Sequence, residues 1–118
     1  MQEVVKFEER GAVLSVALTC EIDHHTARTI RDKIDKKLFT VKPDVLELDF
    51  SAVRFMDSSG VGLIIGRCSV CESIRATVRV VGLSPLLMKL VRLSGIEKIK
   101  NLGIYGASDK PDDERIFK

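Results

Sequence analysis

The spacing of the hydrophobic residues along this chain switches several times between the period of a strand and the period of a helix. Every second residue from Leu14 to Leu18 is apolar, as in a strand with one buried face. From Ala27 to Leu38 the apolar residues recur every three or four positions, and charged residues occupy the positions between them. Repeated switching of this kind is typical of an α/β domain.

The whole chain divides into strand-type and helix-type segments in an alternating order. The expected elements are a hairpin of strands Val4–Glu8 and Ala12–Cys20 with its turn at Arg10–Gly11, a helix from the cap Asp23 to about Phe39, a strand Val45–Phe50, a helix after Asp57, a strand Thr77–Gly82, a helix from Ser84–Pro85 to Gly95, and a last apolar segment Ile99–Tyr105. Strand–helix–strand repeats imply parallel pairing. We therefore predict an α/β fold: a mixed sheet with an N-terminal hairpin, packed against helices.

Length and composition limit the organisation of the chain and its environment. The 118 residues are 45% hydrophobic and carry a net charge of +2, which predicts one domain and gives no broad basic surface for DNA. Nothing resembles a membrane span or a signal peptide, and three cysteines suit a reducing compartment, so we expect a cytoplasmic protein. We place the domain at 1–108, followed by a charged, loosely ordered tail at 109–118.

Two polar loops follow predicted strands and are the best candidates for a functional site. Residues 20–26 offer Asp23, His24 and a second histidine, and residues 57–62 offer Asp57 and two serines. Loops at the carboxyl ends of parallel strands form the usual functional edge of such a sheet. If both loops lie on that edge, carboxylates, imidazoles and hydroxyls converge there.

The second loop has a structural interpretation and a regulatory one. Asp57, Ser58 or Ser59 could simply cap the following helix. However, Gly60, Gly62 and Gly66 follow within two turns, and each costs roughly 1 kcal/mol relative to alanine inside a helix. They favour a surface that another molecule approaches closely. A phosphate on a serine at this helix start would also be compatible with the helix dipole.

Catalytic and metal-binding alternatives have less support. A serine hydrolase would pair Ser58 or Ser59 with His24 or His25, but the chain lacks the G-x-S-x-G elbow. Cys68 and Cys71 have redox spacing within a predicted helix, where small core residues are the better interpretation; there we expect one buried side made of Val61, Ile64, Ile65, Cys68 and Cys71. We expect no catalytic residue, metal or cofactor.

Two separated segments resemble the signatures of a known family. Residues 55–67 read FMDSSGVGLIIGR and residues 21–27 read EIDHHTA. Both are similar to segments of the bacterial STAS-domain anti-sigma factor antagonists, most closely to those that free the forespore sigma factor in sporulation. The similarity runs from about Val13 to Ile99, and Ser94–Gly95 lies where the family's third helix ends.

The resemblance implies a regulatory function without catalysis. It implies that the unphosphorylated protein binds an anti-sigma factor that is also an ATP-dependent serine kinase, which releases the sigma factor. The kinase would then phosphorylate Ser58, and a PP2C-type serine phosphatase would reverse this. The expected docking surface comprises Asp23, His24, Asp57, Ser58, Ser59, Gly60 and Gly62. The alternative is a STAS module that scaffolds partners or senses a ligand in another regulatory complex.

Overall fold

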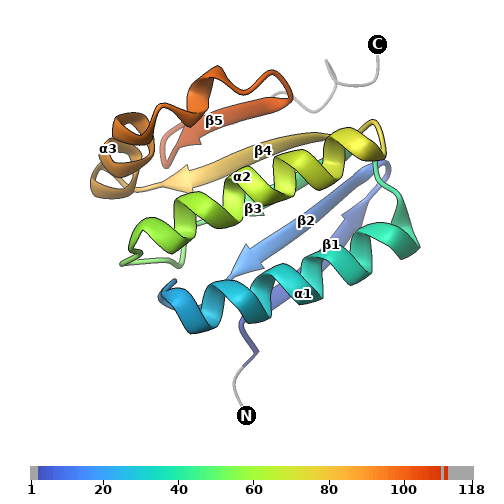
Figure 1. Ribbon diagram of the computed structural model, residues 1–118, viewed down its shortest axis with the longest axis horizontal. Coiled ribbons are helices and arrows are strands. Elements are labelled where there is room, and N and C mark those ends of the chain that lie inside the picture. The colour runs from blue at the N-terminus through green and yellow to red at the C-terminus, as the bar shows by residue number, and fades with distance from the viewer. Residues whose placement is uncertain (1–2, 110, 112–118) are drawn as a thin grey trace.

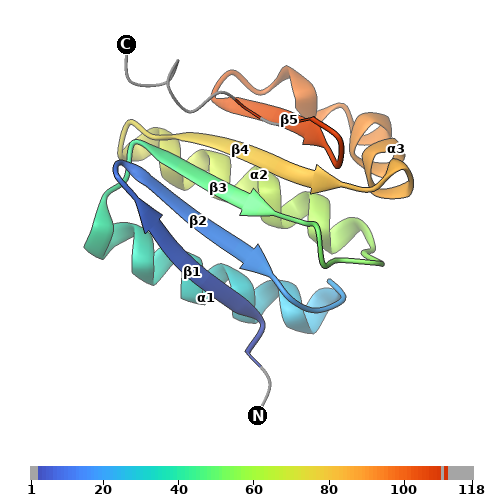
Figure 2. The same ribbon diagram turned by 180° about the vertical axis from the view of Figure 1, so that it is seen from behind.

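Five strands form a single sheet in which strand order equals chain order (Figures 1 and 2). A computed structural model describes residues 3–109 and 111. The elements are β1 (Val5–Arg10), β2 (Val13–Leu18), α1 (His24–Val41), β3 (Val45–Asp49), α2 (Ser58–Ser73), β4 (Thr77–Leu83), α3 (Pro85–Ser94), a 3-10 turn (Ile96–Lys98) and β5 (Leu102–Gly106). The first two strands are antiparallel and the remaining neighbours are parallel. The predicted fold class is confirmed.

The N-terminal hairpin is present with a shifted turn. Arg10 pairs with Val13, so the turn residues are Gly11 and Ala12 rather than the predicted Arg10 and Gly11. Gly11 has a φ of +58°, a left-handed conformation that glycine adopts without steric cost. The strand that follows ends at Leu18, so Cys20 lies beyond it.

Helices α1 and α2 lie side by side over one face of the sheet (Figure 1). The hydrophobic core lies between this helix layer and the sheet. Every second residue of β2 from Leu14 to Leu18 is completely buried on that face, as the alternation predicted. Ile30 and Ile34 of α1 are equally buried. Apolar burial on both layers therefore fixes the strand register, because a shift by one residue would expose the buried set.

The predicted helices are present, with one correction to the end of α1 and one to the buried side of α2. α1 continues to Val41, where Lys42 in the left-handed region ends it, and Phe39 is 59% exposed within the last turns. In α2, Leu63 is buried and Ile65 is 45% exposed, contrary to the prediction for Ile65. The α3 prediction is confirmed, with Ser84 as its cap and Gly95 as its left-handed end.

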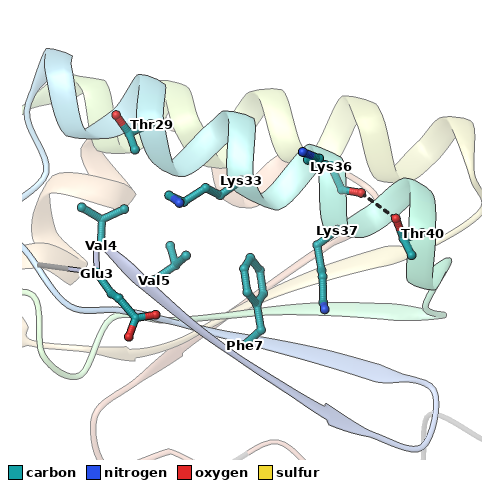
Figure 3. A pocket seen from close by; sticks show the side chains of 9 residues that line it. All are labelled: Glu3, Val4, Val5, Phe7, Thr29, Lys33, Lys36, Lys37 and Thr40. Atoms are coloured by element: carbon teal, nitrogen blue, oxygen red, sulfur yellow. Dashed lines mark hydrogen bonds between the residues drawn. The ribbon is translucent and has the colours of Figure 1, made fainter. Parts of the chain in front are cut away.

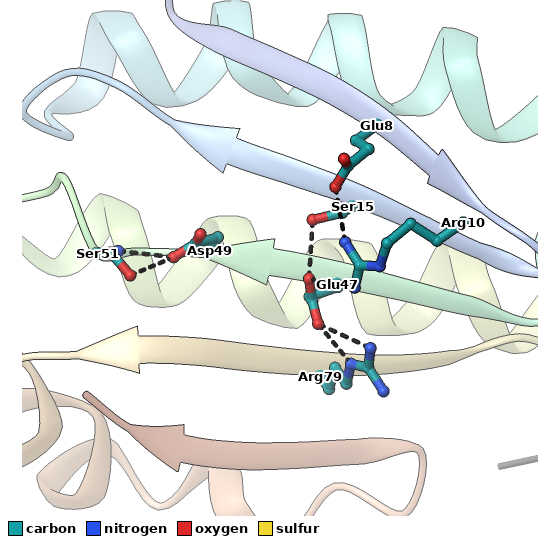
Figure 4. A network of polar contacts seen from close by, with 7 residues as sticks. All are labelled: Glu8, Arg10, Ser15, Glu47, Asp49, Ser51 and Arg79. Atoms are coloured by element: carbon teal, nitrogen blue, oxygen red, sulfur yellow. Dashed lines mark hydrogen bonds and ion pairs between the residues drawn. The ribbon is translucent and has the colours of Figure 1, made fainter. Parts of the chain in front are cut away.

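A charged network crosses the opposite face of the sheet (Figure 4). Ser15, Glu47 and Arg79 are register partners on β2, β3 and β4. The Ser15 hydroxyl donates to Glu47 Oε1 at 2.8 Å, and Arg79 Nε donates to Glu47 Oε2 at 2.8 Å. Arg10 Nη2 lies 3.1 Å from Glu47 Oε1. The carboxylate of Glu47 on β3 thus links its strand to β1, β2 and β4.

Most of the predicted tail falls outside the part of the chain that the structure describes. Residue 109 begins the predicted tail, but positions 110 and 112–118 lie outside the described residues, so the tail and the boundary at 108 stay predictions.

Candidate functional site

The two polar loops lie side by side, as the sequence predicted. Ile22 and Met56 form a parallel bridge beyond the ends of β2 and β3. Ile22 N–H donates to the Phe55 carbonyl at 3.1 Å, and Asp57 N–H donates to the Ile22 carbonyl at 3.1 Å. This backbone pairing joins the start of α1 to the start of α2, so the side chains of both loops share one end of the molecule.

Asp23 begins α1 with a reciprocal cap. Its carboxylate accepts from Thr26 N–H at 2.9 Å, while the Asp23 N–H donates to the Thr26 hydroxyl at 2.9 Å. The hydrogen bond from the Thr26 backbone lowers the pKa of Asp23 below its ordinary value. His24 and His25 follow in the first turn, exposed, with their rings edge to face at 6.0 Å. The first loop therefore presents a fixed carboxylate and two accessible imidazoles.

Asp57, rather than either serine, caps α2. Its carboxylate accepts from Ser59 N–H at 2.8 Å. Ser58 is exposed at the first position of the helix, and its hydroxyl makes no hydrogen bond to any part of the chain that the structure describes. The capping interpretation thus applies to the aspartate, and the Ser58 hydroxyl is accessible for modification.

The glycines of α2 divide into one packed position and two open ones. Gly60 is buried, and a Cβ there would lie 2.5 Å from Met56 Sδ, so this glycine permits close packing within the domain. Gly62 and Gly66 would each place a Cβ in open space. The expected glycine surface therefore consists of Gly62 and Gly66, and Gly60 lies beneath it.

A shallow groove of about 290 Å³ runs between α1 and α2 from these loops. Its lining residues are His24, Ala27, Arg28, Arg31, Ser59, Gly62, Leu63, Gly66 and Arg67. Three guanidinium groups line the groove, and two of them are paired with carboxylates: Arg31 with Asp32 and Arg67 with Asp35. The pKa of Arg67 is lowered by burial, while Asp35, 2.9 Å from Arg67 Nε, opposes that shift.

Sequence reasoning did not identify these arginines as part of the site. One signal was present, because Arg67 is the only charged residue between Asp57 and Glu72. Arg28 and Arg31 are three residues apart and therefore share a helix face. Their alignment with α2 depends on how the two helices pack, which the periodicity of either helix does not reveal.

The cysteines belong to the interior. Cys68 and Cys71 are almost completely buried on α2, and burial raises the pKa of Cys68 to about 11 and of Cys71 to about 12. Such thiols are protonated at neutral pH, which agrees with the predicted core role. Among residues 3–109 and 111, no three histidine, cysteine, aspartate or glutamate side chains converge as metal ligands.

The remaining alternatives concern hydrolysis and membranes. Ser59 and His24 both line the α1–α2 groove, yet within the described chain neither Ser58 nor Ser59 forms a side-chain hydrogen bond to a histidine. No helix among the described residues has the length and apolar character needed to span a membrane.

Comparisons with known proteins agree with the two signature segments. The family model for the STAS domain matches residues 5–108. The anti-sigma F factor antagonist of Paenibacillus polymyxa is 32% identical over 95 residues, which cover 80% of this chain and 81% of that protein. The structure of the anti-sigma factor antagonist SpoIIAA in its unphosphorylated form matches with a TM-score of 0.74 at 27% identity, covering 95% of this chain and 92% of that one. Phosphorylated SpoIIAA from Bacillus gives a TM-score of 0.67 at 27% identity, with coverages of 95% and 96%.

Proposed function

The chain belongs to the STAS domain family, and from this we propose that it is an anti-sigma factor antagonist controlled by phosphorylation of Ser58. Anti-sigma factor antagonists of this family are regulatory proteins and not enzymes, so the serine hydrolase alternative is set aside. In the proposed cycle the unphosphorylated chain binds an anti-sigma factor with serine-kinase activity and thereby frees a sigma factor. The kinase then phosphorylates Ser58, and a PP2C-type phosphatase removes the phosphate.

The observation that carries the proposal is the environment of Ser58. Its exposed hydroxyl forms no hydrogen bond to the described chain, while the neighbouring Asp57 satisfies the helix start. A kinase could therefore reach the hydroxyl without displacing a structural contact. SpoIIAA, which shares the fold, has been solved in unphosphorylated and phosphorylated forms, which supports a modification of the same kind here.

The proposed docking surface surrounds this serine. It consists of Asp23 and His24 from the first loop and of Asp57, Ser58, Ser59 and Gly62 from the second. Gly60 contributes from below, because its missing side chain lets Met56 pack beneath α2 and hold the two loops together. The open space at Gly62 would allow a partner's backbone to approach the helix closely.

Electrostatics provides the release step. A phosphate adds about −1.5 to −2 charges at the helix start, where the dipole accommodates an anion within the free domain. Burying that charge in an interface built for a hydroxyl costs several kcal/mol, and each 1.4 kcal/mol weakens binding tenfold. The phosphate thus acts on the complex and leaves the fold of the domain intact.

The names of the relatives support a class of partner for this proposal. The Paenibacillus polymyxa relative is named for sigma F, so the proposed target is an anti-sigma factor of that type in the cytoplasm of a sporulating cell. No part of this cycle requires DNA, a membrane, a metal or a cofactor on this chain.

The decisive experiment is phosphorylation by the purified anti-sigma kinase of the source organism with ATP, followed by mass mapping of the modified residue. We expect a single phosphate on Ser58, none in Ser58→Ala, and normal modification of the control Ser69→Ala, which changes an exposed serine of α2 outside the docking surface. Ser58→Ala should bind the kinase and never be released. Modification elsewhere, or no binding of the unphosphorylated chain, would refute the proposal.

Calorimetry of the phosphorylated protein tests the release step separately. We expect its free energy of unfolding to differ from that of the unmodified protein by less than the loss of a helix cap, about 0.5–2 kcal/mol. A larger loss would show that phosphorylation remodels the domain itself.

A further inference from the structure

A second groove, larger than the α1–α2 groove, lies between α1 and the edge strand β1 (Figure 3). It encloses about 580 Å³, within the range of small-molecule sites. Its floor is apolar and consists of Val4, Val5 and Phe7. Val5 is 4% exposed, whereas Val4 and Phe7 are only partly buried and leave apolar surface available to a ligand.

Three lysines of α1 form the wall of this groove. Lys33, Lys36 and Lys37 line it, and Lys37 Nζ lies 5.6 Å from the centroid of the Phe7 ring (Figure 3). The two acidic residues of α1 are engaged by arginines: Asp32 pairs with Arg31, and Asp35 pairs with Arg67. Within the described chain, no carboxylate lies within 4 Å of the three ammonium groups. The groove therefore combines an apolar floor with cations that lack a counterion.

The polar groups of the groove bear on whether an alkyl chain or a peptide binds there. A bound peptide would need partners for its own N–H and C=O groups, and leaving them unmet is costly. The side-chain hydroxyls of the lining are already engaged, because Thr29 donates to the His25 carbonyl at 3.4 Å and Thr40 donates to the Lys36 carbonyl at 3.2 Å. Backbone partners for an extended peptide are present along the free edge of β1, the first strand of the sheet. An alkyl chain needs no such partners and matches the apolar floor, and the wall from Thr29 to Thr40 is about 16 Å long at the rise of an α-helix. A peptide paired with β1 is the alternative that the experiment separates.

We propose that this groove binds a medium-chain fatty acid, with the alkyl chain along Val4, Val5 and Phe7 and the carboxylate held by the lysines of α1. Glu3, the one acidic residue of the lining, then lies at the end of the groove formed by the start of β1 (Figure 3). The site lies on the opposite side of α1 from Arg28 and Arg31, so it is separate from the proposed partner surface.

Titration calorimetry with decanoate tests the proposal on the full chain. Decanoate should bind saturably, whereas acetate, which lacks the chain, and decyltrimethylammonium, which reverses the charge, should bind at least about tenfold more weakly. The double variant Lys33→Gln/Lys37→Gln should lose about tenfold in affinity for decanoate. Lys6→Gln is the matched control, because Lys6 lies on β1 with its side chain on the other face of the sheet.

Amide chemical-shift mapping checks where decanoate binds on the protein. Decanoate should shift resonances of residues 4–7 and 29–40 and leave those of residues 57–62 unchanged. Both lysine variants should keep the wild-type unfolding temperature, since these side chains are exposed or half-buried. Absence of decanoate binding, equal binding of decyltrimethylammonium, unchanged affinity in the lysine variant, or binding only of a glutamate-rich peptide would each overturn the proposal.

Discussion

At the scale of single residues, the two adjacent serines of the second loop have different environments. Ser58 is exposed at the helix start, whereas Ser59 is half-buried, donates its N–H to Asp57 and lines the α1–α2 groove. Ser59 can thus belong to the proposed contact surface while Ser58 is the more accessible of the two hydroxyls for a kinase. The next open position along this surface is Gly62, where a substitution can test the surface without touching the serines.

Gly62→Arg should abolish binding of the anti-sigma factor while the domain stays folded. A Cβ at Gly62 meets no atom within 4 Å, so the domain accepts the side chain, but a long cation would cover the approach to α2. Binding is measured by calorimetry and folding by thermal denaturation. Ser69→Arg, at an exposed position farther along the same helix, is the control and should bind normally. Normal binding by Gly62→Arg would mean that the surface lies elsewhere.

Glu47→Gln should lower the free energy of unfolding by about 3 kcal/mol, because it removes the charge that compensates buried Arg79. Burial alone would raise the pKa of Glu47, but the hydrogen bonds from Ser15 and Arg10 and the charge of Arg79 outweigh it and lower the pKa. The charged Glu47 therefore stabilises the fold fully at a pH above the ordinary glutamate pKa, and this stabilisation is lost as the pH falls through the lowered pKa of Glu47 in the folded protein. Denaturant titrations of both proteins should converge in acid. The exposed Glu9→Gln is the control, and a constant difference across pH would contradict the explanation.

At the scale of elements, buried residues could be predicted best from the sequence where a segment has a single clear spacing of its apolar residues. α1 has a polar face and a narrow apolar stripe, so its buried residues Ile30, Ile34 and Leu38 could be read directly. α2 is apolar almost all round its first turns, so the same method placed Ile65 inside and overlooked Leu63. The α1–α2 groove depends on how α1 packs against α2, and the second groove depends on how α1 packs against β1. The local pattern of one segment does not encode such packing.

Asp57→Ala should destabilise the domain by about 1 kcal/mol through the loss of the α2 cap. The removed carboxylate also lies at the positive end of the helix dipole, so both effects have the same sign. The control is Glu72→Ala at the other end of α2, where an exposed anion opposes the dipole and its removal should leave stability unchanged or slightly higher. Equal losses in the two variants, measured by urea denaturation, would argue against a capping role.

At the scale of the whole molecule, the three cysteine thiols are buried to different extents. Cys20 is half-buried beside the first loop, whereas Cys68 and Cys71 lie in the core with strongly raised pKa values. With an alkylating reagent at pH 8, Cys20 should react in the native state and the other two only after global unfolding. Mass spectrometry of timed samples resolves the sites. Native-state modification of Cys71 at the rate of Cys20 would show that the core opens locally.

The agreement between strand order and chain order has a consequence for how the protein is made. Each strand after the first pairs with the strand synthesised just before it, so none has to wait for a later segment to supply its neighbour. On the ribosome, the hairpin and α1 can form first, and β3, β4 and β5 can then be added in turn as they emerge. The loops that contain Asp23 and Ser58 pair through Ile22 and Met56, so the backbone pairing at the proposed regulatory site needs no residue of β4 or β5.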